Sequence, residues 1–152
     1  MIVVSVVNVE DDLRRLVDDI NQASWDQANE ISSYAVATLS AYLSRQDTVF
    51  LACHDVDGAT TTLLGMASAR LEIKPYGNER WLYVDEVDVC ADQRRRGAGR
   101  ALMEKLIELA RDAGCEEVWL GTEHDNDAAN ALYRSLGPDE VAQVVGYTYE
   151  TD

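Results

Sequence analysis

Arg94-Arg95-Arg96-Gly97-Ala98-Gly99-Arg100 joins a predicted strand to a predicted helix, and this stretch decides the fold. The helix that follows carries its apolar residues on one face, at Leu102, Leu106, Leu109, Ala110 and Ala113. A loop of this kind presents free backbone N–H groups at a helix N-terminus, where the helix dipole favours an anion. Gly97 and Gly99 let the backbone approach a ligand closely. In a chain of net charge −15, this concentration of arginine predicts a bound phosphate. The alternative is a helix start with solvated arginines.

The composition limits the classes of protein to which this chain can belong. At 152 residues, the chain is predicted to form one domain spanning 1–152. The 28 Asp and Glu residues outnumber the 13 Lys and Arg residues, which disfavours nucleic-acid binding because a phosphate backbone needs a basic face. No apolar run is long enough for a membrane span, and the first residues lack a basic leader. The acidic excess fits either steering of a polycationic substrate or adaptation to high salt.

The three cysteines are odd in number and lack close metal-ligand spacing, so we predict no metal site. Reduced thiols of this kind are typical of a cytoplasmic protein, and we therefore expect a cytoplasmic location.

Hydrophobic periodicity predicts a mixed α/β chain in the order β-α-α-β-β-β-α-β-α-β. A mixed sheet with helices on its faces is therefore expected. The predicted strands are 2–9, 48–54, 61–71, 81–89, 117–122 and 141–149, and the predicted helices are 11–21, 30–44, 97–113 and 127–135. Asp57-Gly58 marks a hairpin turn between the second and third strands, and Gly114 ends the third helix.

Two motifs at this spacing resemble those of the GNAT superfamily of N-acetyltransferases. Its phosphate signature, Arg/Gln-x-x-Gly-x-Gly/Ala, matches 94–99. About thirty residues on, its second signature, Asn-x-x-Ala-x-x-Leu-Tyr followed by Leu-Gly, matches 126–137. The resemblance covers 49–137, and the chain departs from it at Pro138, where the family usually has an aromatic residue. Within the superfamily, the acidic residues of 85–89, the arginine-rich loop and the segment 131–137 are most similar to type I aminoglycoside 3-N-acetyltransferases. Polyamine acetyltransferases carry a similar acidic pair.

The resemblance implies a GNAT-like fold with acetyl-CoA as the cosubstrate. Backbone N–H groups of the arginine-rich loop would hold its pyrophosphate, and the backbone around Val87 and Val89 would pair with its pantetheine arm. The cofactor-binding residues predicted in this way are Val87, Asp88, Val89, Arg94, Arg95, Arg96, Gly97, Ala98, Gly99, Arg100, Asn126, Ala129 and Tyr133.

Acetyl transfer to an amine needs a group that takes up the ammonium proton, because only the neutral amine is a nucleophile. Glu86 is our first choice for this base, with Asp85 and Asp88 as competitors, and all three are predicted to bind the substrate. On a flat strand Glu86 and Asp88 share one face while Asp85 points to the other. A strand bulge, as members of the superfamily have here, changes those directions. The alternative for these residues is a solvated acidic strand.

Tyr133 is the predicted general acid toward the leaving CoA thiolate, because its phenol is a hydrogen-bond donor. Ala129 and Tyr133 share one helical face, four residues apart. Packing is the alternative role for Tyr133. Asn126 is predicted either to hydrogen-bond the pantetheine arm or to cap the helix.

These features together predict an acetyl-CoA-dependent N-acetyltransferase in which an amine attacks the thioester directly. The predicted substrate is a small cationic amine, similar to an aminoglycoside or a polyamine. Two alternatives stay open: a protein N-terminal or lysine acetyltransferase, and a non-catalytic CoA-binding module. A homodimer is the assembly that we consider.

Overall fold

A computed structural model describes residues 1–26 and 31–152. The chain forms two compact units, Met1–Leu120 and Gly121–Asp152. The first unit contains the sheet and the second contains one helix. That 1–152 forms a single domain stays a prediction.

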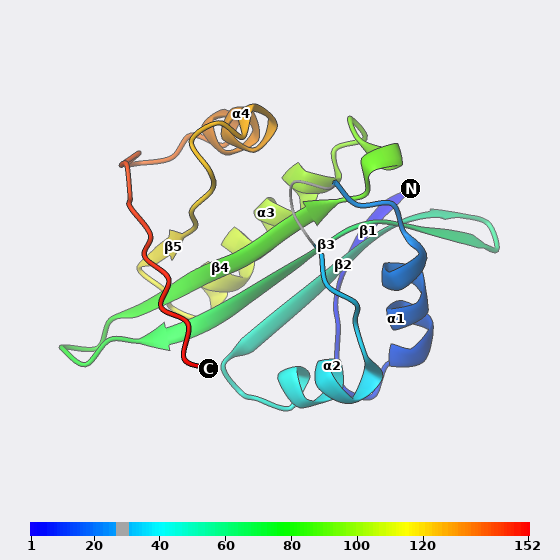
Figure 1. Ribbon diagram of the computed structural model, residues 1–152, viewed down its shortest axis with the longest axis horizontal. Coiled ribbons are helices and arrows are strands. Elements are labelled where there is room, and N and C mark those ends of the chain that lie inside the picture. The colour runs from blue at the N-terminus through cyan, green and yellow to red at the C-terminus, as the bar shows by residue number, and fades with distance from the viewer. Residues whose placement is uncertain (27–30) are drawn as a thin grey trace. The chain divides into compact units, whose positions relative to one another are not determined.

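The first unit is built on a five-stranded sheet in the order β1-β2-β3-β4-β5. Its strands are β1 (Ile2–Val6), β2 (Thr48–Asp57), β3 (Thr60–Ile73), β4 (Arg80–Val89) and β5 (Glu117–Trp119). Neighbours pair antiparallel from β1 to β4, whereas β4 and β5 pair parallel over only three residues each. The predicted mixed sheet is confirmed, and β4 extends well beyond the end of its pairing with β5 (Figure 1).

Helices cover both faces of the sheet. Helices α1 (Leu13–Gln22) and α2 (Val36–Leu43) lie on one face, and α3 (Ala98–Asp112) lies on the other (Figure 1). Side chains of β2 alternate between the two faces, as strand geometry requires. Phe50 and Ala52 join the core beneath α1 and α2. The predicted apolar face of α3 is confirmed, because Leu102 and Leu106 are fully buried.

Most predicted elements of this unit are confirmed with small shifts at their ends. A two-residue turn at Gly58 and Ala59 joins β2 to β3, and Gly58 adopts a φ of +60°. Gly114 follows α3 with a φ of +73°, a conformation that favours glycine at a helix end. The thiols of Cys53, Cys90 and Cys115 are free, and burial raises the pKa of Cys53 and Cys90 to about 11.

Helix α2 begins later than the prediction of 30–44, of which Glu30 lies outside the described residues. Residues 31–35 are not helical. The side-chain amide of Asn21 explains the difference, because it hydrogen-bonds both backbone groups of Tyr34. Its Nδ2 donates to the Tyr34 carbonyl at 2.9 Å, and its Oδ1 accepts from the Tyr34 N–H at 2.8 Å. These bonds hold the segment extended until Ala35, which caps the helix with φ −131°.

The second unit contains α4 (Asp127–Ser135), as predicted from the sequence. The prediction of a last strand at 141–149 is wrong. All of these residues are described, and none is in a strand. Alternating valines and tyrosines favour a strand, but a strand exists only by pairing its backbone with a neighbour. The apolar side chains of this segment are correspondingly exposed, from 59% at Val141 to 84% at Tyr149.

Strand β5 is also shorter than predicted, ending at Trp119 instead of at residue 122. No helix in the described part of the chain has the length and apolarity needed to cross a bilayer.

Candidate active site

A β-bulge in β4 places two acidic side chains together. Ser68 of β3 pairs with Glu86, but the next residue of β3, Ala69, pairs with Val84, so Asp85 is an extra residue in β4. An extra residue interrupts the alternation of side chains, and Asp85 and Glu86 therefore reach the same side of the sheet. Of the two geometries considered from the sequence, a flat strand and a bulged one, the structure has the bulged one.

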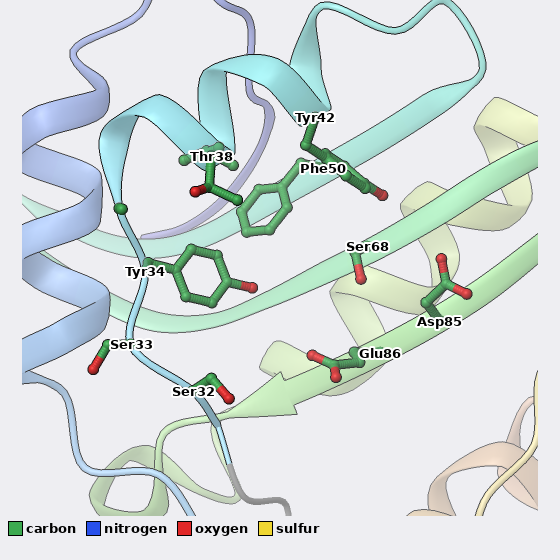
Figure 2. Close-up of a pocket in the computed structure, with 11 residues that line it drawn as sticks. Ser32, Ser33, Tyr34, Thr38, Tyr42, Phe50, Ser68, Asp85 and Glu86 are labelled. Carbon is green, nitrogen blue, oxygen red and sulfur yellow. The ribbon is translucent and has the colours of Figure 1, made fainter. Parts of the chain in front are cut away.

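Asp85 and Glu86 line a pocket of about 370 Å³ between the sheet and the segment that leads into α2 (Figure 2). Besides these acids, the lining consists of apolar or neutral side chains: Ser32, Ser33, Tyr34, Ala35, Thr38, Leu39, Tyr42, Phe50 and Ser68. No basic side chain belongs to this described lining. A pocket with these walls favours a cationic group that is attached to an apolar body.

Three aromatic rings form the apolar wall of the pocket. Tyr34 and Tyr42 both meet Phe50 edge to face, with ring centroids 6.1 and 6.4 Å apart. The Tyr42 hydroxyl donates to the Ala69 carbonyl at 3.0 Å, which fixes its ring against the sheet. Figure 2 shows the Tyr34 hydroxyl pointing instead toward the side of the pocket that holds Ser68 and Glu86.

The acidic residues are close enough to perturb the ionisation of Tyr34. Burial first, and then the charges of Glu86 and Asp88, raises the pKa of Tyr34 to about 12. The phenol therefore stays protonated at neutral pH and is available as a hydrogen-bond donor or acceptor beside Glu86.

Asp88 differs from the other two acids because it is 5% exposed and does not belong to the described pocket lining. Its charge acts on Tyr34 from a buried position. The structure thus brings Asp85 and Glu86 together at the pocket and keeps Asp88 beneath its surface. The roles of all three in substrate binding stay predictions.

The predicted phosphate loop ends in an open helix N-terminus. Gly97 is the N-cap of α3 with φ +83°, and no side chain caps this helix. None of the described residues accepts a hydrogen bond from the N–H groups of Ala98 or Gly99. Arg95, just before them, has a φ of 64°, which is uncommon for a residue with a side chain. Free N–H groups at the start of a fifteen-residue helix fit the pyrophosphate that the motif predicts.

Two of the three adjacent arginines are already paired with carboxylates. Arg94 forms an ion pair with Asp26, and Arg96 forms one with Asp55. The ammonium of Met1 and then Arg96 hold the pKa of Asp55 below its usual range. Within the described residues Arg95 has no ion pair. Of these three arginines it is therefore the one whose positive charge is not balanced by a carboxylate.

The second half of β4 offers open backbone groups along one edge. The Cys90 N–H donates to the Leu64 carbonyl at 2.8 Å, which fixes the alternation of the antiparallel ladder. Glu86 and Asp88 therefore direct their backbone groups to β3, whereas Val87 and Val89 direct theirs away from it. Since β5 pairs with β4 only up to Tyr83, the groups of Val87 and Val89 lie beyond that pairing. This arrangement fits the predicted role of Val87 and Val89 toward an extended ligand. The backbone groups of Asp88, in contrast, are directed to β3 and not to the open edge of β4.

The remaining predicted residues lie in the second unit. Asn126 caps α4, because its side chain accepts a hydrogen bond from the Ala129 N–H at 3.1 Å. Of the two roles predicted for Asn126, the structure therefore shows the cap. Ala129 and Tyr133 are both half-buried and lie one turn apart on the same face of α4, as expected. The catalytic role of Tyr133 stays a prediction.

Sequence reasoning missed the pocket residues outside the acidic strand. Tyr34 and Tyr42 both fall within the helix predicted for 30–44. The sequence therefore did not indicate that Tyr34 lies in an extended segment. Arg70 was also missed, although it pairs with Asp85, Nε to Oδ2, at 3.1 Å. Its signal was the alternation of Arg70 and Glu72 along β3, which places these charged side chains on one face.

The chain is similar to known proteins in sequence and in fold. The model of the acetyltransferase (GNAT) family matches residues 11–137. The [ribosomal protein bS18]-alanine N-acetyltransferase of Escherichia coli (strain K12) is 41% identical over 66 residues, which is 43% of this chain and 45% of that protein. Human N-acetyltransferase 8 is 31% identical over 103 residues, 68% of this chain and 44% of that protein. The matched region thus spans slightly less than half the length of these curated relatives.

Solved structures share the fold over nearly the whole chain. An aminoglycoside acetyltransferase from an uncultured soil metagenomic sample, in complex with sisomicin, has a TM-score of 0.83 at 18% identity, covering 99% of this chain and 97% of that one. AAC(6')-Iy in complex with a CoA bisubstrate analog has a TM-score of 0.75 at 17% identity, with 99% of both chains covered. At these identities the likeness shows the fold alone.

Proposed function

The chain belongs to the acetyltransferase (GNAT) family, and from that premise we propose that it transfers an acetyl group from acetyl-CoA to a primary amine. The observation that carries the proposal is the pocket in which Asp85 and Glu86, placed together by the bulge in β4, face an aromatic wall. An ammonium group is the functional group that such a pocket selects, because a carboxylate stabilises it where water is partly excluded.

Acetyl-CoA, the acetyl donor of this family, supplies a thioester whose carbonyl carbon is attacked by the amine. The residues that would hold it are the N–H groups of Ala98 and Gly99 at the pyrophosphate and the open backbone groups of Val87 and Val89 along the pantetheine arm. Arg95 adds positive charge at the same loop. These groups lack partners among the described residues, and so they fit a ligand with an anionic end and an extended amide chain.

Glu86 is the residue that we assign as general base. Its carboxylate first binds the ammonium form of the substrate and then takes up one proton, directly or through a water, so that the neutral amine can attack. Tyr133 is the residue that we assign as general acid toward the leaving thiolate, on the strength of the second family signature. Direct transfer needs no covalent intermediate on the protein.

The substrate predicted from the sequence is a small cationic amine, aminoglycoside- or polyamine-like. The pocket of about 370 Å³ supports a small body, and the structural neighbours that act on aminoglycosides support only the fold. A peptide N-terminus is the second candidate, because the [ribosomal protein bS18]-alanine N-acetyltransferase of E. coli is 41% identical over 66 residues. Cytoplasmic location and homodimer formation stay predictions from the sequence.

The experiment is an acetyl-CoA-dependent assay of thiol release over a panel of small amines, aminoglycosides and peptides that begin with alanine. We expect turnover with at least one small amine and slower turnover with the peptides. Calorimetry with CoA, carried out on the same preparation, reports binding separately. Binding of CoA without turnover on any amine would contradict the proposal and favour a non-catalytic CoA-binding module.

A further inference from the structure

Asp85 is paired with an arginine, Arg70, that it shares with a second carboxylate, Glu72. Arg70 of β3 donates from Nε to Asp85 Oδ2 at 3.1 Å and from Nη2 to Oδ1 at 3.3 Å. Its Nη1 donates to Glu72 at 2.5 Å, and its guanidinium carbon lies 5.9 Å from the centroid of the Tyr83 ring. Arg70 therefore occupies a defined position over the sheet, with its donors directed at two carboxylates.

Glu86 is in a different electrostatic state from its neighbour. It forms no ion pair with any residue among 1–26 and 31–152. Of the two acids that line the pocket, Glu86 is therefore the one whose carboxylate is available to the ammonium of a ligand. Glu86 lines the pocket, and Figure 2 shows its carboxylate directed toward the side of the pocket that holds Tyr34.

Apart from Asp85 and Glu86, the described lining of the pocket has no charged side chain. The rings of Tyr34, Tyr42 and Phe50 and the side chain of Leu39 line the same pocket. A second ammonium that lay against these rings would lose its water, and one that approached Asp85 would compete with the guanidinium of Arg70. Both outcomes cost free energy, because a desolvated charge needs a partner.

Resting on the proposed acetyltransferase function, we infer that the acceptor is a primary amine with one positive charge on an aromatic or aliphatic body. Arg70 acts as the specificity residue, because its ion pair occupies Asp85 and leaves Glu86 as the acid of the pocket lining without an ion pair in the described part of the chain. The inference departs from the polyamine- and aminoglycoside-like substrates predicted from the sequence. The apolar body lies against the aromatic wall, and the ammonium lies between Glu86 and the Tyr34 hydroxyl.

The test compares two amines that differ by one charge, pentylamine and 1,5-diaminopentane, with 2-phenylethylamine as the aromatic member. For the unaltered protein we expect kcat/KM for both monoamines to exceed that for the diamine about tenfold or more. Arg70→Gln leaves Asp85 uncompensated and should shift the ratio at least fivefold toward the diamine. Arg45→Gln is the matched control, because it removes an exposed arginine whose partner is Asp47, outside the pocket. It should leave the ratio unchanged.

A second variant guards against a folding defect in Arg70→Gln. Asp85→Asn leaves the Arg70 charge less compensated, so it should shift the ratio in the opposite direction, further toward the monoamines. Preference of the unaltered protein for the diamine would overturn the inference while leaving the proposed function intact. An unchanged ratio in a folded Arg70→Gln or Asp85→Asn variant would also overturn it.

Absence of turnover on every amine is a separate outcome that contradicts the proposed function. In that case calorimetry with pentylamine and 1,5-diaminopentane, in the presence of CoA, still decides the preference of the pocket. Tighter binding of pentylamine supports the charge argument, and tighter binding of the diamine overturns it.

Discussion

Gly97 offers the sharpest test of the anion site at the start of α3. It adopts a φ of +83°, and a Cβ placed on it would meet nothing within 4 Å. Gly97→Ala therefore tests the backbone conformation alone, without a steric clash. Gly97→Asp adds a negative charge at the same point, next to the open N–H groups of Ala98 and Gly99.

The two effects have different sizes and different readouts. A left-handed conformation costs a residue with a side chain about 1–2 kcal/mol, which should lower the Tm of either variant by about 2–8 °C. Two like charges ~4 Å apart repel by about 4 kcal/mol near a protein surface and about 1 kcal/mol in bulk water. Because Gly97 is exposed, we take a repulsion of about 1–2 kcal/mol with one phosphate. This corresponds to roughly 5–30-fold weaker CoA binding for Gly97→Asp.

Calorimetry with CoA, together with thermal unfolding, separates the two contributions. Gly77→Asp is the matched control: Gly77 also has a positive φ, +60°, with open space around its Cβ, but it lies in the β3–β4 turn. We expect a lower Tm for all three variants and a large loss of CoA affinity for Gly97→Asp alone. Equal affinities for folded Gly97→Asp and Gly77→Asp would refute the assignment of this helix start to the pyrophosphate.

Three further predictions concern individual side chains. Tyr133→Phe should leave CoA binding nearly unchanged and lower the rate of the chemical step about 100-fold, the low end for proton donation; a full rate would make Tyr133 a packing residue. Glu86→Gln should lower the rate at neutral pH and recover partly as pH rises, since more of the amine is then neutral; failure to recover would exclude Glu86 as the base. The pKa of Tyr34 and of Tyr42 is raised to about 12, chiefly by burial, so the unfolded chain ionises these phenols first and stability should fall between pH 10 and 12. Tyrosinate absorbance should show late-titrating phenols in the folded protein, one fewer in Tyr34→Phe, and titration of every tyrosine near pH 10 would contradict this.

The elements that the sequence predicted well are those whose signal is local. The face of α3 follows from apolar residues at helical spacing, and its start follows from Gly97, whose conformation excludes most other residues. The hairpin at Gly58 is a turn of the same kind. In each case the chemistry of a few neighbouring residues decides the backbone, so an isolated sequence is enough.

The errors arise where a distant partner decides the backbone. Residues 31–35 have helical periodicity, but the side chain of Asn21 binds the backbone of Tyr34 and keeps it extended. Residues 141–149 alternate like a strand, yet they pair with no strand in the described part of the chain. Neither outcome is encoded in the segment itself. A tertiary contact, or its absence, overrides the local preference in both.

The arrangement of the acidic residues at the pocket depends both on the local sequence and on contacts with distant residues. The sequence shows three acidic residues within 85–89, but their spacing alone divides them between two faces of a flat strand. One extra residue in β4 puts Asp85 beside Glu86, and the pairing of Asp85 with Arg70 then makes the two carboxylates unequal. A base needs a charge that the protein has not already neutralised, and Glu86 meets that condition whereas Asp85 does not. The choice of Glu86 as base, made first on motif position, therefore gains an electrostatic reason that depends on the bulge.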